Sequence, residues 1–73
     1  MTTEKKTILL NTQQTLRMYR DNDYIGSIRN FTESIEVNTE QYPSSKEICI
    51  DYFSNGLSLH MWCDRYEVIE NDN

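Results

Sequence analysis

Residues 47–64, EICIDYFSNGLSLHMWCD, contain two apolar-rich runs separated by Asn55-Gly56. Asn-Gly is the strongest short-range signal for a β-hairpin with a two-residue type I′ turn, because both central residues of that turn need a positive φ. Glycine adopts a positive φ without steric cost, and asparagine tolerates it. The stretch therefore predicts two antiparallel strands joined at residues 55–56.

A two-residue loop sets the register of this hairpin, and side chains alternate between the two faces of a strand. One face is predicted to carry the pairs Ser54–Leu57, Tyr52–Leu59, Ile50–Met61 and Ile48–Cys63. The other face is predicted to carry Phe53–Ser58, Asp51–His60, Cys49–Trp62 and Glu47–Asp64. A three-residue loop would place Leu59 opposite Asp51 and mix the faces, and such slips are penalised where one face is buried. We therefore expect the two-residue loop.

Residues 15–28, TLRMYRDNDYIGSI, predict a second hairpin. Asp and Asn stabilise turns with their own side chains and tolerate left-handed φ, so we expect a four-residue loop at residues 20–23. The predicted partners are Tyr19–Tyr24, Met18–Ile25, Arg17–Gly26 and Leu16–Ser27. An alternative is one helix within residues 12–34, because apolar positions 25, 28 and 35 follow a helical spacing. Gly26 and the β-branched content argue against that helix.

Three further segments have β patterns. Residues 7–11 form a short apolar run, residues 31–38 alternate except at Glu33, and residues 65–70 can form a last strand. Residues 39–46 contain Pro43 and are predicted to be the longest loop. About six short strands at this spacing are typical of an all-β fold, a small antiparallel barrel or sandwich. We expect that fold to be built on hairpins 15–28 and 47–64.

Length and composition limit the organisation of the chain. Its 73 residues leave room for one domain, in which we expect residues 1–6 and 71–73 to be frayed. Only 37% of the residues are hydrophobic, so the core is small and we expect a homodimer. The sequence shows no signal peptide and no membrane-length apolar run. Cys49 and Cys63 lie on opposite faces of the predicted hairpin, so we expect free thiols and a cytoplasmic protein.

The charge of the chain is acidic and uneven. The formal net charge is −5, and residues 31–73 hold nine acidic side chains but only two basic ones. An acidic surface disfavours anionic membranes and nonspecific nucleic-acid binding. We therefore expect no membrane partner and a protein partner with a basic surface.

A search for chemistry finds no catalytic or cofactor motif. Asp51, His60 and Ser58 have the composition of a triad on one face of the hairpin, but no nucleophile elbow or oxyanion loop accompanies them. The lone His60 and two cysteines on opposite faces do not predict a four-ligand zinc site. The acids lack the spacing of a calcium loop. We therefore expect no enzyme activity, no metal and no cofactor.

The sequence favours a protein that works by binding. Small acidic domains of this size are typical of phage or mobile-element accessory proteins, some of them anti-defence inhibitors that block a basic cleft of a nucleic-acid-handling or defence enzyme. Such a protein would act in the host cytoplasm. The residues expected to contact the partner are the acids Glu33, Glu36, Glu40, Glu47, Asp51 and Asp64, with Phe53 and Trp62 as apolar anchors.

The alternative is a small oligomeric β-protein that binds nucleic acid or an anionic small ligand. Arginines beside aromatic residues can hold phosphates and stack on bases. The residues expected to do so are Arg17, Arg20, Arg29, Tyr19 and Tyr24. The acidic turn and the net charge make nucleic acid the less favoured partner.

Overall fold

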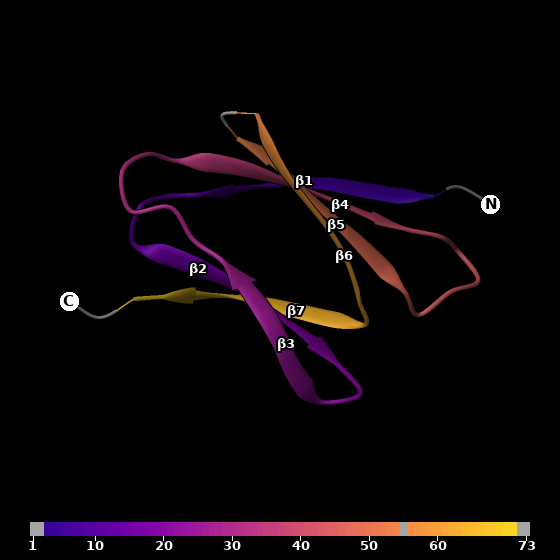
Figure 1. Cartoon of the computed structure of the whole chain (residues 1–73). Coiled ribbons are helices and arrows are strands. Elements are labelled where there is room, and N and C mark those ends of the chain that lie inside the picture. Colours follow the sequence, from indigo (N-terminus) through magenta and orange to yellow (C-terminus); the bar gives the residue numbers. More distant parts are fainter. Residues whose placement is uncertain (1–2, 55, 72–73) are drawn as a thin grey trace.

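The protein folds into two antiparallel sheets, as shown by a computed structural model that describes residues 3–54 and 56–71 (Figure 1). The strands are β1 (Glu4–Leu10), β2 (Gln14–Arg20), β3 (Asp23–Ile28), β4 (Ile35–Gln41), β5 (Ile48–Ser54), β6 (Leu57–Cys63) and β7 (Arg65–Glu70). One sheet has the order β1-β4-β5-β6 and the other the order β3-β2-β7. The prediction of an all-β fold is confirmed, as a sandwich-like pair of sheets.

The alternative of a helix within residues 12–34 is wrong, because those residues form β2, β3 and the segments that flank them. Within the described part of the chain, no helix is long and apolar enough to cross a membrane.

The hairpin of β5 and β6 has the predicted register. Seven of the eight predicted pairs are observed, from Ile48 opposite Cys63 at the open end to Ser54 opposite Leu57 beside the loop, so the loop has two residues. The eighth predicted pair, Glu47–Asp64, lies outside the two strands. Gly56 has a φ of 79°, as the second position of a type I′ turn requires. Asn55, the predicted first position, lies outside the described residues.

The hairpin of β2 and β3 differs from the prediction. Its loop has two residues rather than four: Asp21 and Asn22 adopt φ values of 52° and 69°, and Arg20 pairs with Asp23. The predicted pair Tyr19–Tyr24 is confirmed. The register then shifts between Met18 and Tyr19, which is a β-bulge with one extra residue on β3.

This bulge changes the partners that follow it. The predicted pairs Met18–Ile25, Arg17–Gly26 and Leu16–Ser27 are replaced by Met18–Gly26, Arg17–Ser27 and Leu16–Ile28. The physical reason lies in the core: the bulge places the buried Ile28 opposite the fully buried Leu16, where the predicted register would have placed Ser27. Gly26 then lies opposite the fully buried Met18, whose methyl carbon is 3.6 Å from the position a Cβ on Gly26 would take.

Three boundaries also differ. β1 begins at Glu4, so residues 4–6 of the segment expected to fray pair with Thr39–Gln41 of β4, while residues 1–2 and 72–73 lie outside the described part. β4 covers residues 35–41, not 31–38, and residues 39–41 therefore belong to a strand rather than to the predicted loop. Asn30 accounts for the late start of β4, because its Oδ1 accepts hydrogen bonds from the backbone N–H groups of Thr32 and Glu33 and holds them in a turn. The last strand is confirmed at Arg65–Glu70.

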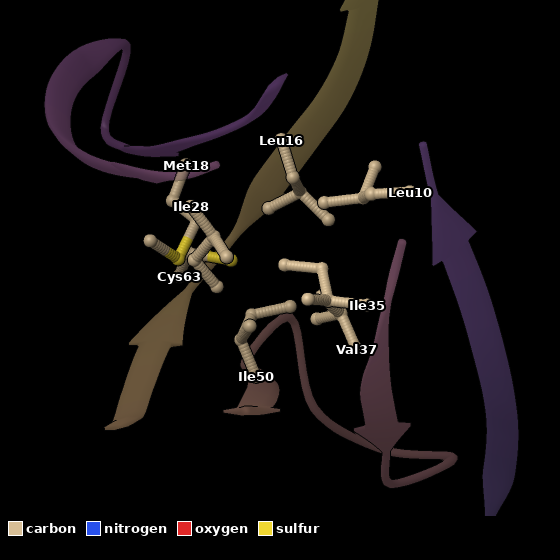
Figure 2. Packing of buried hydrophobic residues seen from close by; sticks show 8 residues of the cluster. All are labelled: Leu10, Leu16, Met18, Ile28, Ile35, Val37, Ile50 and Cys63. Carbon is tan, nitrogen blue, oxygen red and sulfur yellow. The ribbon is translucent and has the colours of Figure 1, made fainter. Parts of the chain in front are cut away.

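The core lies between the two sheets, where side chains from both inner faces interdigitate (Figure 2). The three-stranded sheet contributes Leu16, Met18 and Ile28, and the four-stranded sheet contributes Leu10, Ile35, Val37, Ile50 and Cys63. Each fully buried aliphatic side chain stabilises the fold by about 1.5–3 kcal/mol relative to an exposed one. Because this core uses only the inner faces, the outer face of each sheet is left for other contacts.

Candidate binding face

The outer face of the four-stranded sheet, called the open face here, follows from the alternation of its strands. On β4, Ile35, Val37 and Thr39 are buried, whereas Glu36 and Asn38 are exposed on the opposite side. The same alternation and register place twelve side chains on the open face: Lys5, Thr7 and Leu9 from β1, Glu36, Asn38 and Glu40 from β4, Cys49, Asp51 and Phe53 from β5, and Ser58, His60 and Trp62 from β6.

Two large aromatic side chains are exposed on the open face. Phe53 is 72% exposed and Trp62 is 39% exposed. They lie toward opposite ends of the β5–β6 hairpin, with the pair Asp51–His60 between them. No further layer of the described chain buries these two rings, so the predicted apolar anchors are accessible in the folded chain.

A polar row crosses the middle of the open face. Thr7 Oγ1 donates a hydrogen bond to Asn38 Oδ1 at 2.9 Å, and Asn38 lies opposite Asp51. Asp51 Oδ1 accepts a hydrogen bond of 2.6 Å from His60 Nδ1. The predicted cross-strand pair of Asp51 and His60 is therefore confirmed. The carboxylate fixes the ring orientation of His60, because a carboxylate can only accept a hydrogen bond.

Cys49 lies next to this pair, on the same face, although its side chain is only 6% exposed. Its Sγ lies 3.6 Å from Asp51 Oδ2, 3.6 Å from His60 Nδ1 and 3.4 Å from His60 Nε2. Trp62 lies opposite Cys49 on β6, and the indole ring meets the His60 ring edge-on at 5.8 Å. Burial, and then the Asp51 carboxylate, raise the pKa of the Cys49 thiol to about 11.

These contacts bring together three potential metal ligands, which we call the Cys49–Asp51–His60 cluster. One ligand atom from each residue lies within 4.8 Å of the others. Sequence reasoning placed all three residues on one face but missed the cluster, because it looked for a site that used both cysteines. The available signal was the i, i+2 spacing of Cys49 and Asp51 together with the cross-strand position of His60.

The predicted triad composition of Asp51, His60 and Ser58 does not assemble as a nucleophilic site. Among the described side chains, His60 contacts Asp51 and Cys49 at hydrogen-bond distance, while Ser58 lies opposite Phe53. The Cys49 sulfur is almost equally far from both ring nitrogens, so it lies beside the ring rather than in line with one lone pair. With a raised pKa, the thiol is protonated at neutral pH and is a poor nucleophile.

The six predicted acids fall into separate groups. Glu36, Glu40 and Asp51 share the open face, and Glu33 lies at its end, where it lines a shallow depression together with Glu36 and Phe53. Glu47 and Asp64 instead hold the two sheets together at the other end. Arg20 Nη2 lies 2.6 Å from Glu47 Oε2, and Asp64 Oδ2 accepts a hydrogen bond from the backbone N–H of Asp21 at 2.8 Å.

The residues of the alternative ligand site do not form one surface either. Tyr19 and Tyr24 meet edge-on at 6.1 Å on the outer face of the three-stranded sheet, and Arg17 lies 5.3 Å from the centre of the Tyr24 ring. Arg65 is not among the predicted residues, and its guanidinium carbon lies 4.0 Å from the centre of the Tyr19 ring. A hydrogen bond to Glu67 raises the pKa of Tyr19.

The other two arginines of that set lie elsewhere and are engaged within the chain. Arg20 pairs with Glu47, and the Arg29 guanidinium lies 3.9 Å from the centre of the Phe31 ring. The five residues therefore divide among three places in the fold.

Comparison with protein-family models, with curated proteins and with solved structures finds no match for this chain. Its function is therefore inferred from the geometry of the chain itself.

Proposed function

We propose that this protein is a non-enzymatic binding protein whose open face contacts a protein partner with a basic surface. The observation that carries this proposal is the exposure of Phe53 and Trp62 on the same sheet face as Glu36, Glu40 and Asp51. Aromatic side chains that are exposed in the free protein and become desolvated on binding are typical anchors of an interface.

The charge of the open face supports a basic partner. Three carboxylates lie on it, and Lys5 is its single Lys or Arg among the described side chains. Complementary charges steer encounter and select the partner, while the apolar anchors supply affinity. The face is built on four paired strands, so binding needs little ordering of the backbone.

In its sharper form, the proposal is that the partner is a nucleic-acid-handling or defence enzyme and that the protein inhibits it, as a phage or mobile-element protein would. Carboxylates fixed on a rigid sheet can occupy the positions that phosphates take in a basic cleft. A double-stranded oligonucleotide should then compete with the protein for the partner, and added salt should weaken the complex.

The test compares three forms of the immobilised protein in capture from a cell extract, followed by direct binding to each captured protein in purified form. Glu36→Lys/Glu40→Lys reverses the charge of the open face. The matched control, Asp23→Lys/Glu70→Lys, makes the same charge change on the three-stranded sheet. We expect a partner with a basic surface that binds the wild type and the control but not the open-face variant.

A second variant, Phe53→Ser, removes an anchor without changing charge and should also weaken the complex. Retention of every purified partner by both open-face variants would overturn the proposal. A partner that ignores the oligonucleotide would support the open face as the interface but contradict inhibition at a nucleic-acid cleft.

A further inference from the structure

We propose that the Cys49–Asp51–His60 cluster is a binding site for one Zn²⁺ ion, held by Cys49 Sγ, an oxygen of Asp51 and Nδ1 of His60. Thiolate, imidazole and carboxylate are the three side-chain ligand types that Zn²⁺ prefers, and three protein ligands with one open position make a recognised zinc geometry. This inference goes beyond the proposed function, because it concerns the chain without a partner.

The two distances from the Cys49 sulfur to its neighbours are close to those of tetrahedral coordination. With ordinary zinc–ligand bond lengths, a sulfur and a nitrogen or oxygen ligand at tetrahedral angles lie about 3.6 Å apart. Cys49 Sγ lies 3.6 Å from His60 Nδ1 and 3.6 Å from Asp51 Oδ2. Both distances from the sulfur therefore have the required length, but the same sulfur lies 3.4 Å from His60 Nε2, so the His60 ring has to turn before Nδ1 points toward the ion.

The contact between His60 and Asp51 also has to change, and it is made by Oδ1 of Asp51 rather than by the Oδ2 that lies 3.6 Å from the sulfur. His60 Nδ1 and Asp51 Oδ1 are 2.6 Å apart because a proton lies between them, whereas two such ligands of one zinc ion lie about 3.4 Å apart. The side chains of His60 and Asp51 are 56% and 47% exposed, so both can rotate outward without disturbing the core. The ion thus takes the place of the hydrogen-bonded proton.

The protons and charges of this step balance. Counted from a neutral imidazole, the ring keeps one proton, which moves from Nδ1 to Nε2, and the Cys49 thiol releases its proton to solvent when the sulfur binds the ion. The doubly charged ion then lies between one thiolate and one carboxylate, so the site is neutral. Metal binding thereby removes the cost of holding a thiolate in a position that is only 6% exposed.

The backbone holds the three ligands rigidly. Cys49 and Asp51 are two residues apart on β5, and His60 lies opposite Asp51 on β6, so one paired hairpin carries the whole site. The fourth position faces solvent and is filled by water. Glu40 lies opposite Cys49 on β4 and adds negative charge beside the ion.

Titration of the purified protein with Co²⁺ tests the site, because Co²⁺ adopts zinc geometry and is visible. We expect a thiolate-to-cobalt charge-transfer band that saturates at one ion per chain and disappears when Zn²⁺ is added. Trp62, the single tryptophan, lies opposite Cys49 and against His60, so its fluorescence should be quenched in parallel.

Cys49→Ser should abolish the charge-transfer band, and Asp51→Asn and His60→Gln should each weaken binding at least about tenfold, since even outer-shell changes have effects of that size. The matched control is Cys63→Ala, which removes the other thiol on the inner face and should keep the band. Circular dichroism of each variant confirms that it is folded.

A wild-type protein without a thiolate band at millimolar Co²⁺, or a band that survives in Cys49→Ser, would overturn the proposal. Because no partner takes part, this result is independent of the test of the open face as a protein interface.

Discussion

At the scale of single residues, the best example of environment changing chemistry is Cys49. Its position on the outer side of β5 would suggest an accessible thiol, yet Trp62, His60 and Asp51 surround it and leave it 6% exposed. Burial disfavours the charged thiolate, and the neighbouring carboxylate repels it. The residue is therefore an inert thiol unless a cation lies beside it.

A pH dependence follows from the raised pKa of Cys49. In the unfolded chain the thiol has its ordinary pKa of 9.0, whereas in the folded chain its pKa is about 11. The contribution of this group to stability is thus complete below pH 9 and is lost as the pH rises through 11. We expect the free energy of unfolding, measured by urea denaturation, to fall more steeply between pH 9 and 11 in the wild type than in Cys49→Ser. Parallel curves for the two proteins would contradict this expectation.

Gly26 gives a second prediction at this scale. A Cβ at this position would lie 3.6 Å from the methyl carbons of Met18 and Met61, which is an ordinary contact distance. Gly26→Ala should therefore be tolerated or raise the unfolding free energy by up to about 1 kcal/mol, because glycine is unfavourable in a strand. Gly26→Leu should lower it by about 1–3 kcal/mol, because the methionines would have to move. Thermal denaturation of both variants measures these two changes in stability and shows how large a side chain the space beside Gly26 accepts.

At the scale of elements, the two hairpins show what the sequence could predict. The β5–β6 register was correct because Asn55-Gly56 specifies a turn type and one face of the hairpin is consistently apolar. The β2–β3 register was correct at Tyr19–Tyr24 despite the different loop length, and it was wrong beyond that pair because a bulge leaves no trace in the alternation. The bulge brings Ile28 onto the inner face opposite Leu16, and the core that buries both residues is formed by tertiary contacts.

The Asp21-Asn22 turn can be tested directly. Both residues have a positive φ, which costs an ordinary side chain about 1–2 kcal/mol and asparagine or aspartate less. Asn22→Gly should therefore leave stability unchanged or improve it, while Asn22→Ala should lower the unfolding free energy by about 1 kcal/mol. Urea denaturation is the measurement. Equal effects of glycine and alanine would show that the backbone conformation of Asn22 is not the determinant.

At the scale of the whole molecule, the sequence predicted the fold class but not the division of the acidic residues. Six acids of residues 31–73 were expected to contact a partner, yet two of them, Glu47 and Asp64, bond to Arg20 and Asp21 instead. Which acids remain on the open face depends on where the chain crosses from one sheet to the other. Those crossings are set by three-dimensional packing, so composition alone could not separate the two groups.

The homodimer stays a prediction at this scale. The core uses only the inner faces of two small sheets, and Leu9 on β1 is 65% exposed. Light scattering should give twice the chain mass of 8.7 kDa, because association would supply apolar contacts that a small core lacks. A mass of one chain at all concentrations would contradict the prediction and show that the two-sheet core is sufficient by itself.

The placement of β7 has a consequence for how the chain reaches its native state. β7 pairs with β2, so residues 65–70 complete a sheet that begins with residues 14–20. A growing chain can form the β2–β3 hairpin early, but β2 keeps one unpaired edge until β7 has been made. Pairing between such distant segments is slow, and unpaired edges invite contacts with other chains. Until β7 docks, the central strand of this sheet is therefore open to pairing with another chain.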